Sequence, residues 1–189
     1  ACEDVGIRPD ETGYGTVTKA LHWVTVLAMA AQFLVGYAID RADDLLDPVA
    51  DRFFAGEPEG LVVVHAALGT GILLTTIVRL VWRRTAGLPP WAPGLSRRER
   101  AVAHTVEVGL YWLLFLIPVS GLGLFLFSGE SWELGRGEWR APWAWVDDDV
   151  LLAVHIAGHA LFFLAIAVHV GIALKHQLID RDGLLRRML

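Results

Sequence analysis

Two histidines, His155 and His169, lie within a stretch of 25 residues, 150–174, that contains no Asp, Glu, Lys or Arg. They are 14 positions apart. At about 100° per residue this interval falls within about 40° of four full turns, so both imidazoles point to one side of a helix, about 21 Å apart along its axis. Titratable side chains at membrane depth are functional candidates, and neutral imidazole is a good iron ligand. The pattern therefore indicates axial ligands for two haems stacked across a bilayer.

The composition favours a membrane protein over a soluble domain. Hydrophobic residues make up 54% of the 189 residues, and the mean hydropathy is +0.48. A single cysteine, Cys2, excludes a disulfide framework, and without a Cys-x-x-Cys-His motif any haem is bound non-covalently. Residues 1–19 lack the apolar core of a secretory signal peptide. We expect residues 1–189 to form one domain.

Four apolar segments are long enough to cross a bilayer as helices, which predicts an all-α transmembrane four-helix bundle. Pro118 lies inside the third segment, and neighbouring helices can compensate for such a residue within a membrane. Residues 40–60 and 128–149 are expected to be polar connections, and Pro89-Pro90 marks a turn. The predicted spans are residues 20–39, 61–82, 108–127 and 150–174.

The distribution of charge predicts the orientation of the bundle. The two ends of the chain and the connection between the second and third spans contain twelve Lys and Arg residues. The other two connections contain four, together with 13 acidic residues. By the positive-inside rule, both termini lie on the cytoplasmic side.

Orientation and spacing together pair four histidines by depth. His22 and His169 are expected near the inner ends of the first and fourth spans, and His65 and His155 near the outer ends of the second and fourth. Two imidazoles on opposite faces of a haem leave no open iron position, which favours electron transfer over oxygen binding. Nearby glycines would let a macrocycle approach the backbone, although they also serve helix packing: Gly36, Gly69, Gly71, Gly158 and Gly171.

Other interpretations of these histidines remain open. A lone histidine in a span is often a hydrogen-bonded packing residue. His155 and His159 are spaced i, i+4 and could bind zinc, but residues 150–174 supply no Cys or carboxylate to complete such a site. We expect His159 to be a pocket residue instead, and His176 to lie beyond the span at the inner interface.

Arg79 follows His65 by 14 residues and should face the inner haem. Its guanidinium could pair with a haem propionate, or could be a topology anchor whose side chain reaches the interface. His104 and Glu107 precede the third span and could carry protons, or could simply be polar residues at the interface.

Several motifs, taken together, resemble the bacterial cytochrome b561 family, the four-helix di-haem cytochromes b of the inner membrane. The resemblance covers residues 18–188. Its marks are Ala20-Leu21-His22-Trp23, His65 with Gly69 and Arg79, His104, Tyr111, residues 116–121 (Leu-Ile-Pro-Val-Ser-Gly), His155, His169, His176 and residues 182–188 (Asp-Gly-Leu-Leu-Arg-Arg-Met).

The resemblance implies two b haems with His22, His65, His155 and His169 as ligands. It also implies a quinone-linked oxidoreductase or electron carrier that exchanges electrons with ubiquinone. Some family members are thought to pass electrons from superoxide to ubiquinone, and others to serve periplasmic carriers. We expect lipid, quinone and a periplasmic electron-transfer protein as partners, no nucleic acid, and an inner-membrane location. The acidic outer connections suit a basic partner, such as a positively charged cytochrome c, better than the superoxide anion.

Two alternatives stay open at this point. One is a cytochrome b membrane-anchor subunit of a hydrogenase-like or formate dehydrogenase-like complex, and short connections argue mildly against it. The other is a haem-free helical scaffold.

Overall fold

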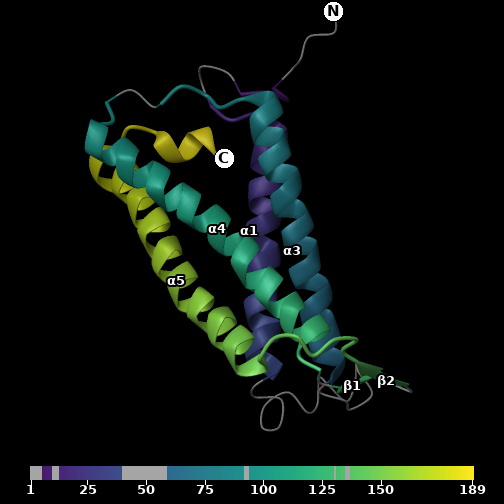
Figure 1. Cartoon of the computed structure of the whole chain (residues 1–189). Helices are drawn as coiled ribbons and strands as arrows, with labels where there is room; N and C mark the ends of the chain where they lie inside the picture. Colours follow the sequence, from purple (N-terminus) through teal and green to yellow (C-terminus); the bar gives the residue numbers. More distant parts are fainter. Residues whose placement is uncertain (1–5, 10–12, 40–58, 92–93, 130, 135–136) are drawn as a thin grey trace, which may run out of the picture.

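The computed structural model describes residues 6–9, 13–39, 59–91, 94–129, 131–134 and 137–189. Each of its four long helices is long and apolar enough to cross a membrane, which confirms the predicted all-α four-helix bundle (Figure 1). Most of the expected connection at residues 40–60 lies outside the described residues. The helices are α1 (Thr16–Ile39), α3 (Glu59–Ala86), α4 (Arg97–Phe127) and α5 (Asp148–Lys175).

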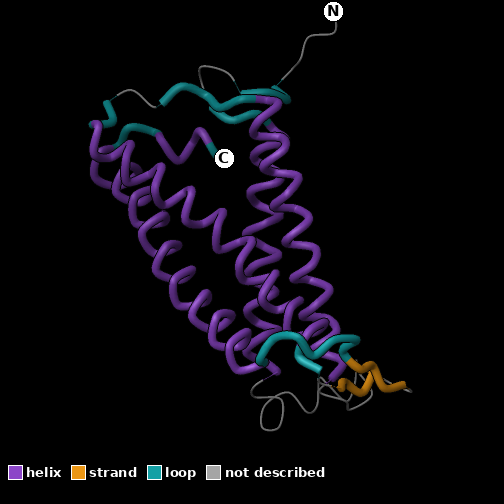
Figure 2. Tube along the Cα trace, in the orientation of Figure 1, coloured by secondary structure: helices purple, strands orange, loops and turns teal. Residues whose placement is uncertain are grey.

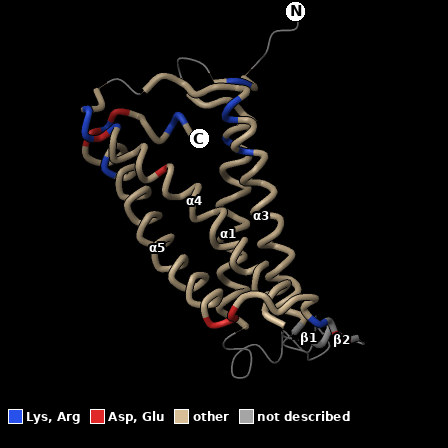
Figure 3. The backbone as a smooth tube through the Cα atoms, in the orientation of Figure 1, with Lys and Arg blue, Asp and Glu red and all other residues tan. Residues whose placement is uncertain are grey.

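The bundle consists of two helical hairpins. α1 packs against α3, α4 packs against α5, and α3 against α4 joins the two hairpins. The described chain is helical along the whole body of the bundle, and its strands lie only at one end (Figure 2). The start of α1 and the C-terminal tail lie at the opposite end, here called the terminal end (Figure 1). Lys and Arg are concentrated at this terminal end (Figure 3).

Two helices begin before their apolar spans, because polar caps start them. Ser96 accepts a hydrogen bond from the Glu99 amide, and the Glu99 side chain accepts one from the Ser96 amide. This capping box starts α4 at Arg97, 11 residues before the predicted span. Asp147 caps α5 by accepting a hydrogen bond from the Val150 amide. Each predicted span thus lies within a longer helix, and polar caps extend α4 and α5 beyond their predicted spans.

The connection between α4 and α5 contains regular structure that the sequence analysis did not predict. β1 (Ser131–Leu134) and β2 (Gly137–Arg140) form an antiparallel hairpin in which Ser131 is opposite Arg140. Beside it, the rings of Phe127, Trp143 and Trp145 stack with centroids 5.4–5.7 Å apart. The hairpin lies at one side of the end opposite the C-terminal tail, beside α3 (Figure 1).

The interior of the bundle is a small apolar core, and the surface is also apolar. The core contains Met29, Ile72, Leu114, Ile117 and Phe162, which come from all four helices. Large side chains on the outside include Leu34, Trp112 and Leu164, which are 74%, 72% and 63% exposed. Such a surface is stable against lipid rather than water.

The last residues of the chain fold back over the terminal end. A π-helical turn (His176–Asp180) extends α5, and a 3-10 turn follows (Leu184–Arg187). Three hydrogen bonds hold this tail: Tyr14 N to Arg187 O (3.2 Å), Trp23 Nε1 to Met188 O (3.1 Å), and Arg187 Nη2 to Pro90 O (2.8 Å). The tail thereby ties together both ends of the chain and the α3–α4 link.

Candidate functional site

The structure brings together the four histidines of the sequence analysis as two pairs. His22 on α1 and His169 on α5 lie nearer the terminal end, with ring centroids 6.3 Å apart. His65 on α3 and His155 on α5 lie nearer the hairpin end, with ring centroids 6.1 Å apart. Each pair therefore joins one helix of the first hairpin to α5 of the second.

These separations allow a test of whether the pairs fit a metal held between two imidazoles. A metal–imidazole nitrogen bond is about 2.0 Å, and the ring centre lies about 1.1 Å beyond, so trans ligands have ring centres about 6.2 Å apart. The observed 6.3 Å and 6.1 Å match this value. In the separation of their ring centres, both pairs are compatible with a metal ion between two imidazoles.

His155 is held in an orientation suited to ligation. Its Nδ1–H donates to the Ile117 carbonyl (2.9 Å), and the Ser120 hydroxyl lies 3.0 Å from the same nitrogen. Protonated Nδ1 fixes the tautomer that leaves the lone pair on Nε2. Gly121 makes room for the ring, because a Cβ at this position would lie 2.9 Å from His155 Cε1. α4 contributes no member of either pair, yet it positions this imidazole.

His65 is positioned through its backbone. Gln32 Nε2 donates to the His65 carbonyl (3.0 Å), and a Cβ at Gly69 would lie only 3.2 Å from Gln32 Nε2. A Cβ at Gly36 would lie 2.8 Å from His65 Cε1. The buried Nδ1 of His65 has no hydrogen-bond partner among the described residues. This side of the bundle thus leaves space for the imidazole ring and brings α1 close to it.

His159 lies among aromatic rings beside the pair near the hairpin end. Its ring centroid is 4.7 Å from that of His155, 5.1 Å from Phe33 and 6.2 Å from Tyr37. Phe33 also contacts Phe162 and Phe163, so these rings fill the space between α1 and α5.

Arg79 lies at the depth of the His22–His169 pair, within electrostatic reach of both imidazoles. Its guanidinium carbon is 5.4 Å from the ring centre of Tyr111. Both residues line a cavity of about 50 Å³ between α1, α3, α4 and the tail. Arg79 therefore lies beside this cavity, near the His22–His169 pair.

The same cavity contains an ion pair. Arg83 donates to both carboxylate oxygens of Glu107, so this carboxylate is bound by a guanidinium. Burial, followed by the nearby Glu107, raises the pKa of Tyr14, which also lines the cavity. His104, by contrast, is exposed on α4.

Four positioning residues had no assigned role in the sequence analysis: Gln32, Ile117, Ser120 and Gly121. Gln32 was visible as a polar residue in an apolar span. Ser120 and Gly121 were visible only as part of a family-like run. Polar or small residues inside a charge-free span were the available signal, but their contacts depend on how α4 packs against α5.

Comparisons with known proteins agree with this geometry. A family model described as prokaryotic cytochrome b561 matches residues 13–189. Cytochrome b561 homolog 2 of Escherichia coli is 28% identical over 93% of this chain and 90% of its own length. Cytochrome b562 of Cereibacter sphaeroides is 28% identical over 95% and 96%. A probable superoxide oxidase CybB of Yersinia pestis is 27% identical over 67% of this chain and 73% of its own length.

The match spans all four helices and both histidine pairs. A b-type haem is the cofactor that this family implies, and the two pairs have the spacing to hold it. The chain therefore belongs to the prokaryotic cytochrome b561 family and is a cytochrome of a bacterial membrane.

Proposed function

We propose that this chain is a di-haem cytochrome b that moves electrons between the quinone pool and a redox partner at the periplasmic side. The observation that carries the proposal is the presence of two histidine pairs at two depths, with ring centroids 6.3 Å and 6.1 Å apart. A bis-imidazole b haem supplies reversible one-electron transfer without an open position for oxygen. With two such sites in one bundle, an electron would cross the membrane in shorter steps than with one site.

Each residue has a defined part in this proposal. His22 and His169 would hold the inner haem, and His65 and His155 would hold the outer one. The Ile117 carbonyl keeps the His155 Nε2 lone pair available for iron. Arg79 would pair with a propionate of the inner haem, because it is a cation near the His22–His169 pair and lines a cavity.

The orientation in this proposal places both termini in the cytoplasm. The terminal end carries most of the Lys and Arg residues, as the positive-inside rule requires (Figure 3). The hairpin end then faces the periplasm and presents exposed carboxylates, among them Glu138 and Asp147–149. This surface favours a basic protein partner by electrostatic attraction.

A second candidate for the outer electron donor is superoxide. The relative from Yersinia pestis named probable superoxide oxidase favours it. The exposed carboxylates at the hairpin end oppose it, because they repel an anion. If superoxide is the donor, the chain reduces ubiquinone at its expense. Stopped-flow reduction by superoxide at several ionic strengths distinguishes superoxide from a basic protein as the donor. If a basic site attracts superoxide, the rate is fast and added salt lowers it; if the carboxylates repel superoxide, the rate is slow and added salt raises it.

The test of the main proposal is the haem content and the reduced-minus-oxidised spectrum of the detergent-purified chain, with ubiquinol as reductant. We expect two non-covalent b haems per chain, both reduced by ubiquinol. One haem would show that one histidine pair is wrongly assigned, and none would refute the proposal. Two haems that ubiquinol does not reduce, with an iron-sulfur protein co-purifying in equal amount, would identify a membrane-anchor subunit instead.

A further inference from the structure

The C-terminal tail, residues 182–189, packs against the start of α1. Two consecutive carbonyls of the tail accept hydrogen bonds from this part of the chain. Arg187 O accepts from the Tyr14 amide at 3.2 Å, and Met188 O accepts from Trp23 Nε1 at 3.1 Å. Trp23 lies in the second turn of α1, so the tail contacts a helix that comes 165 positions earlier in the chain.

The approach of the tail to α1 leaves little free space between them. A Cβ at Gly13 would lie 3.0 Å from Arg187 O and 3.2 Å from Arg187 Cα, so this position favours glycine. Met188 also lines the cavity that Leu21 and Arg79 line. The last residues of the chain therefore reach the region of the His22–His169 pair.

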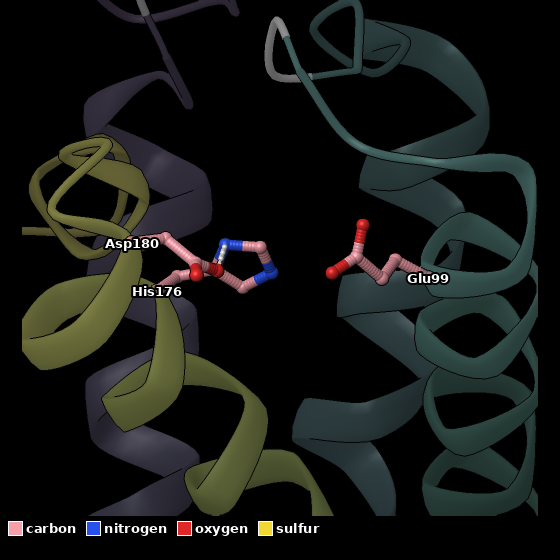
Figure 4. Close-up of side chains that lie close together, drawn as sticks. All are labelled: Glu99, His176 and Asp180. Atoms are coloured by element: carbon pink, nitrogen blue, oxygen red, sulfur yellow. Dashed lines mark ion pairs between the residues drawn. The ribbon is translucent and has the colours of Figure 1, made fainter.

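The start of the tail is fixed as well. His176 is 3% exposed and donates Nδ1–H to Asp182 Oδ2 at 2.6 Å, while Asp182 Oδ1 accepts from the Leu184 amide at 3.0 Å. Figure 4 shows the His176 ring with Asp180 on its Nδ1 side and Glu99 of α4 facing its opposite side. The direction in which the tail leaves α5 is therefore set by side chains at the end of that helix.

The indole of Trp23 connects this tail to the imidazole of His22. The two ring centroids are 5.4 Å apart, and the ring planes meet edge to face at 81°. Within the described residues the His22 side chain makes no hydrogen bond, and its ring contacts are with Trp23 and His169. His155, by contrast, is oriented by the Ile117 carbonyl. The orientation of His22 therefore depends on packing against neighbouring rings.

We propose that Trp23 is a positioning residue for the inner haem site and that the C-terminal tail holds it in place. The Met188 carbonyl fixes the indole, and the indole edge fixes the plane of the His22 imidazole. This plane lies 51° from that of His169. Neighbouring groups commonly orient the ligands of metal sites, and here the orienting group is itself held by the end of the chain. The inference rests on the proposed haem between His22 and His169.

Trp23→Phe tests the inference, because it keeps an aromatic ring beside His22 and removes the Nε1–H donor. The full-length, haem-loaded chain in detergent is used. Docking of the tail is measured by hydrogen exchange of the Tyr14 amide, with mass spectrometry of the peptide that contains it, because this amide donates to the tail. Loss of the hydrogen bond to Met188 should raise the exchange rate about 2- to 12-fold.

The plane of the His22 imidazole is measured by electron paramagnetic resonance of the oxidised chain. The largest g value of a low-spin ferric haem with two imidazole ligands depends on the angle between the two ring planes. Trp23→Phe should shift the signal of the inner haem and leave that of the outer haem unchanged. His169→Ala identifies the inner signal as the one that it removes.

Gly13→Val should give both results without changing Trp23. Its side chain would meet the backbone of Arg187 and displace the tail, although Gly13 lies three residues before α1. Trp82→Phe is the matched control, because it removes another indole donor at the terminal end, the hydrogen bond to Thr18 Oγ1 at 3.2 Å, and keeps the hydrogen bonds of the tail. It should change neither the exchange rate nor the inner signal.

Three results would overturn the inference. Unchanged exchange in both variants would show that these contacts do not dock the tail. Faster exchange with an unchanged inner signal would leave Trp23 as an aromatic residue of the membrane interface. An equal shift in Trp82→Phe would show a general loosening of this end.

Failure of the proposed function has a different signature. A wild-type chain without an inner haem signal would refute the proposed inner haem, and with it the role of Trp23 in positioning a ligand. Hydrogen exchange needs no haem and would still decide whether the Met188 carbonyl holds Trp23. Haem per chain is measured on every variant, and Gly13→Val is the test if Trp23→Phe does not fold.

Discussion

Gly121→Ala is the substitution that most directly tests the positioning of the outer pair. The added Cβ would lie 2.9 Å from His155 Cε1 and 3.3 Å from Nδ1, whereas ordinary contacts begin at 3.4 Å. The imidazole must therefore move by about 0.5 Å, an amount that is enough to spoil a ligand geometry. The hydrogen bond from Nδ1–H to the Ile117 carbonyl opposes this movement, because Ile117 lies on the same helix as the new methyl group.

The size of the effect follows from the cost of overpacking. Forcing one methyl group into a filled site costs about 1–3 kcal/mol. If the strain is relieved only when the imidazole leaves the iron, outer-site haem binding weakens by about 5- to 150-fold. The inner site should be unaffected, because His22 and His169 do not contact Gly121.

The assay is haem per chain in the purified variant, combined with a potentiometric titration that resolves two components. His155→Ala identifies the outer component as the one that it removes. Gly109→Ala is the matched control, because Gly109 lies on the same helix and a Cβ there would have no atom within 4 Å. Full outer-site occupancy and an unchanged titration in Gly121→Ala would refute the reasoning, as would an equal loss in Gly109→Ala.

Three further predictions concern the remaining contacts. His169→Ala should lose the inner haem and keep the outer one, and His159→Ala should keep both haems. The ligand assignment would be refuted if His159→Ala lost a haem while His155→Ala retained two. Arg79→Ala should retain both haems but lower the potential of the inner one by roughly 40 mV, because a nearby cation disfavours the oxidised iron, and Arg79→Lys should stay close to the wild type. An unchanged potential in Arg79→Ala would leave this residue as a topology anchor. Gln32→Leu should retain both haems and lower the free energy of unfolding by about 0.6 kcal/mol, because it removes the interhelical hydrogen bond to the His65 carbonyl. Thermal unfolding followed by circular dichroism measures this loss. An unchanged midpoint temperature would show that the hydrogen bond does not stabilise the protein.

Much of the fold could be predicted because the apolar spans are long and nearly free of charge. Helical spacing and the direction of each span also predicted which histidines lie together, namely His22 with His169 and His65 with His155. These properties depend on local sequence and on the membrane as a solvent. They do not require knowledge of how side chains interlock.

The sequence could not reveal contacts that depend on the packing of one helix against another. The hydrogen bond from His155 to the Ile117 carbonyl is one example, because any residue of α4 could have faced α5. The β1–β2 hairpin is another, since its strands are only four residues long and lie in a stretch rich in glycine and charge. The convergence of Glu99 with His176 also depends on tertiary structure, because 77 positions separate them.

The distribution of the paired histidines has a consequence for how the protein is made. Each pair takes one member from the first hairpin and the other from α5, which comes last of the four long helices in chain order. In the proposed arrangement, neither haem could acquire its second histidine ligand until α5 has been made. The tail contacts to Tyr14 and Trp23 form later still, because the tail follows α5 in the chain. Cofactor loading should therefore wait for the synthesis of α5, and chains truncated before α5 should accumulate without either haem.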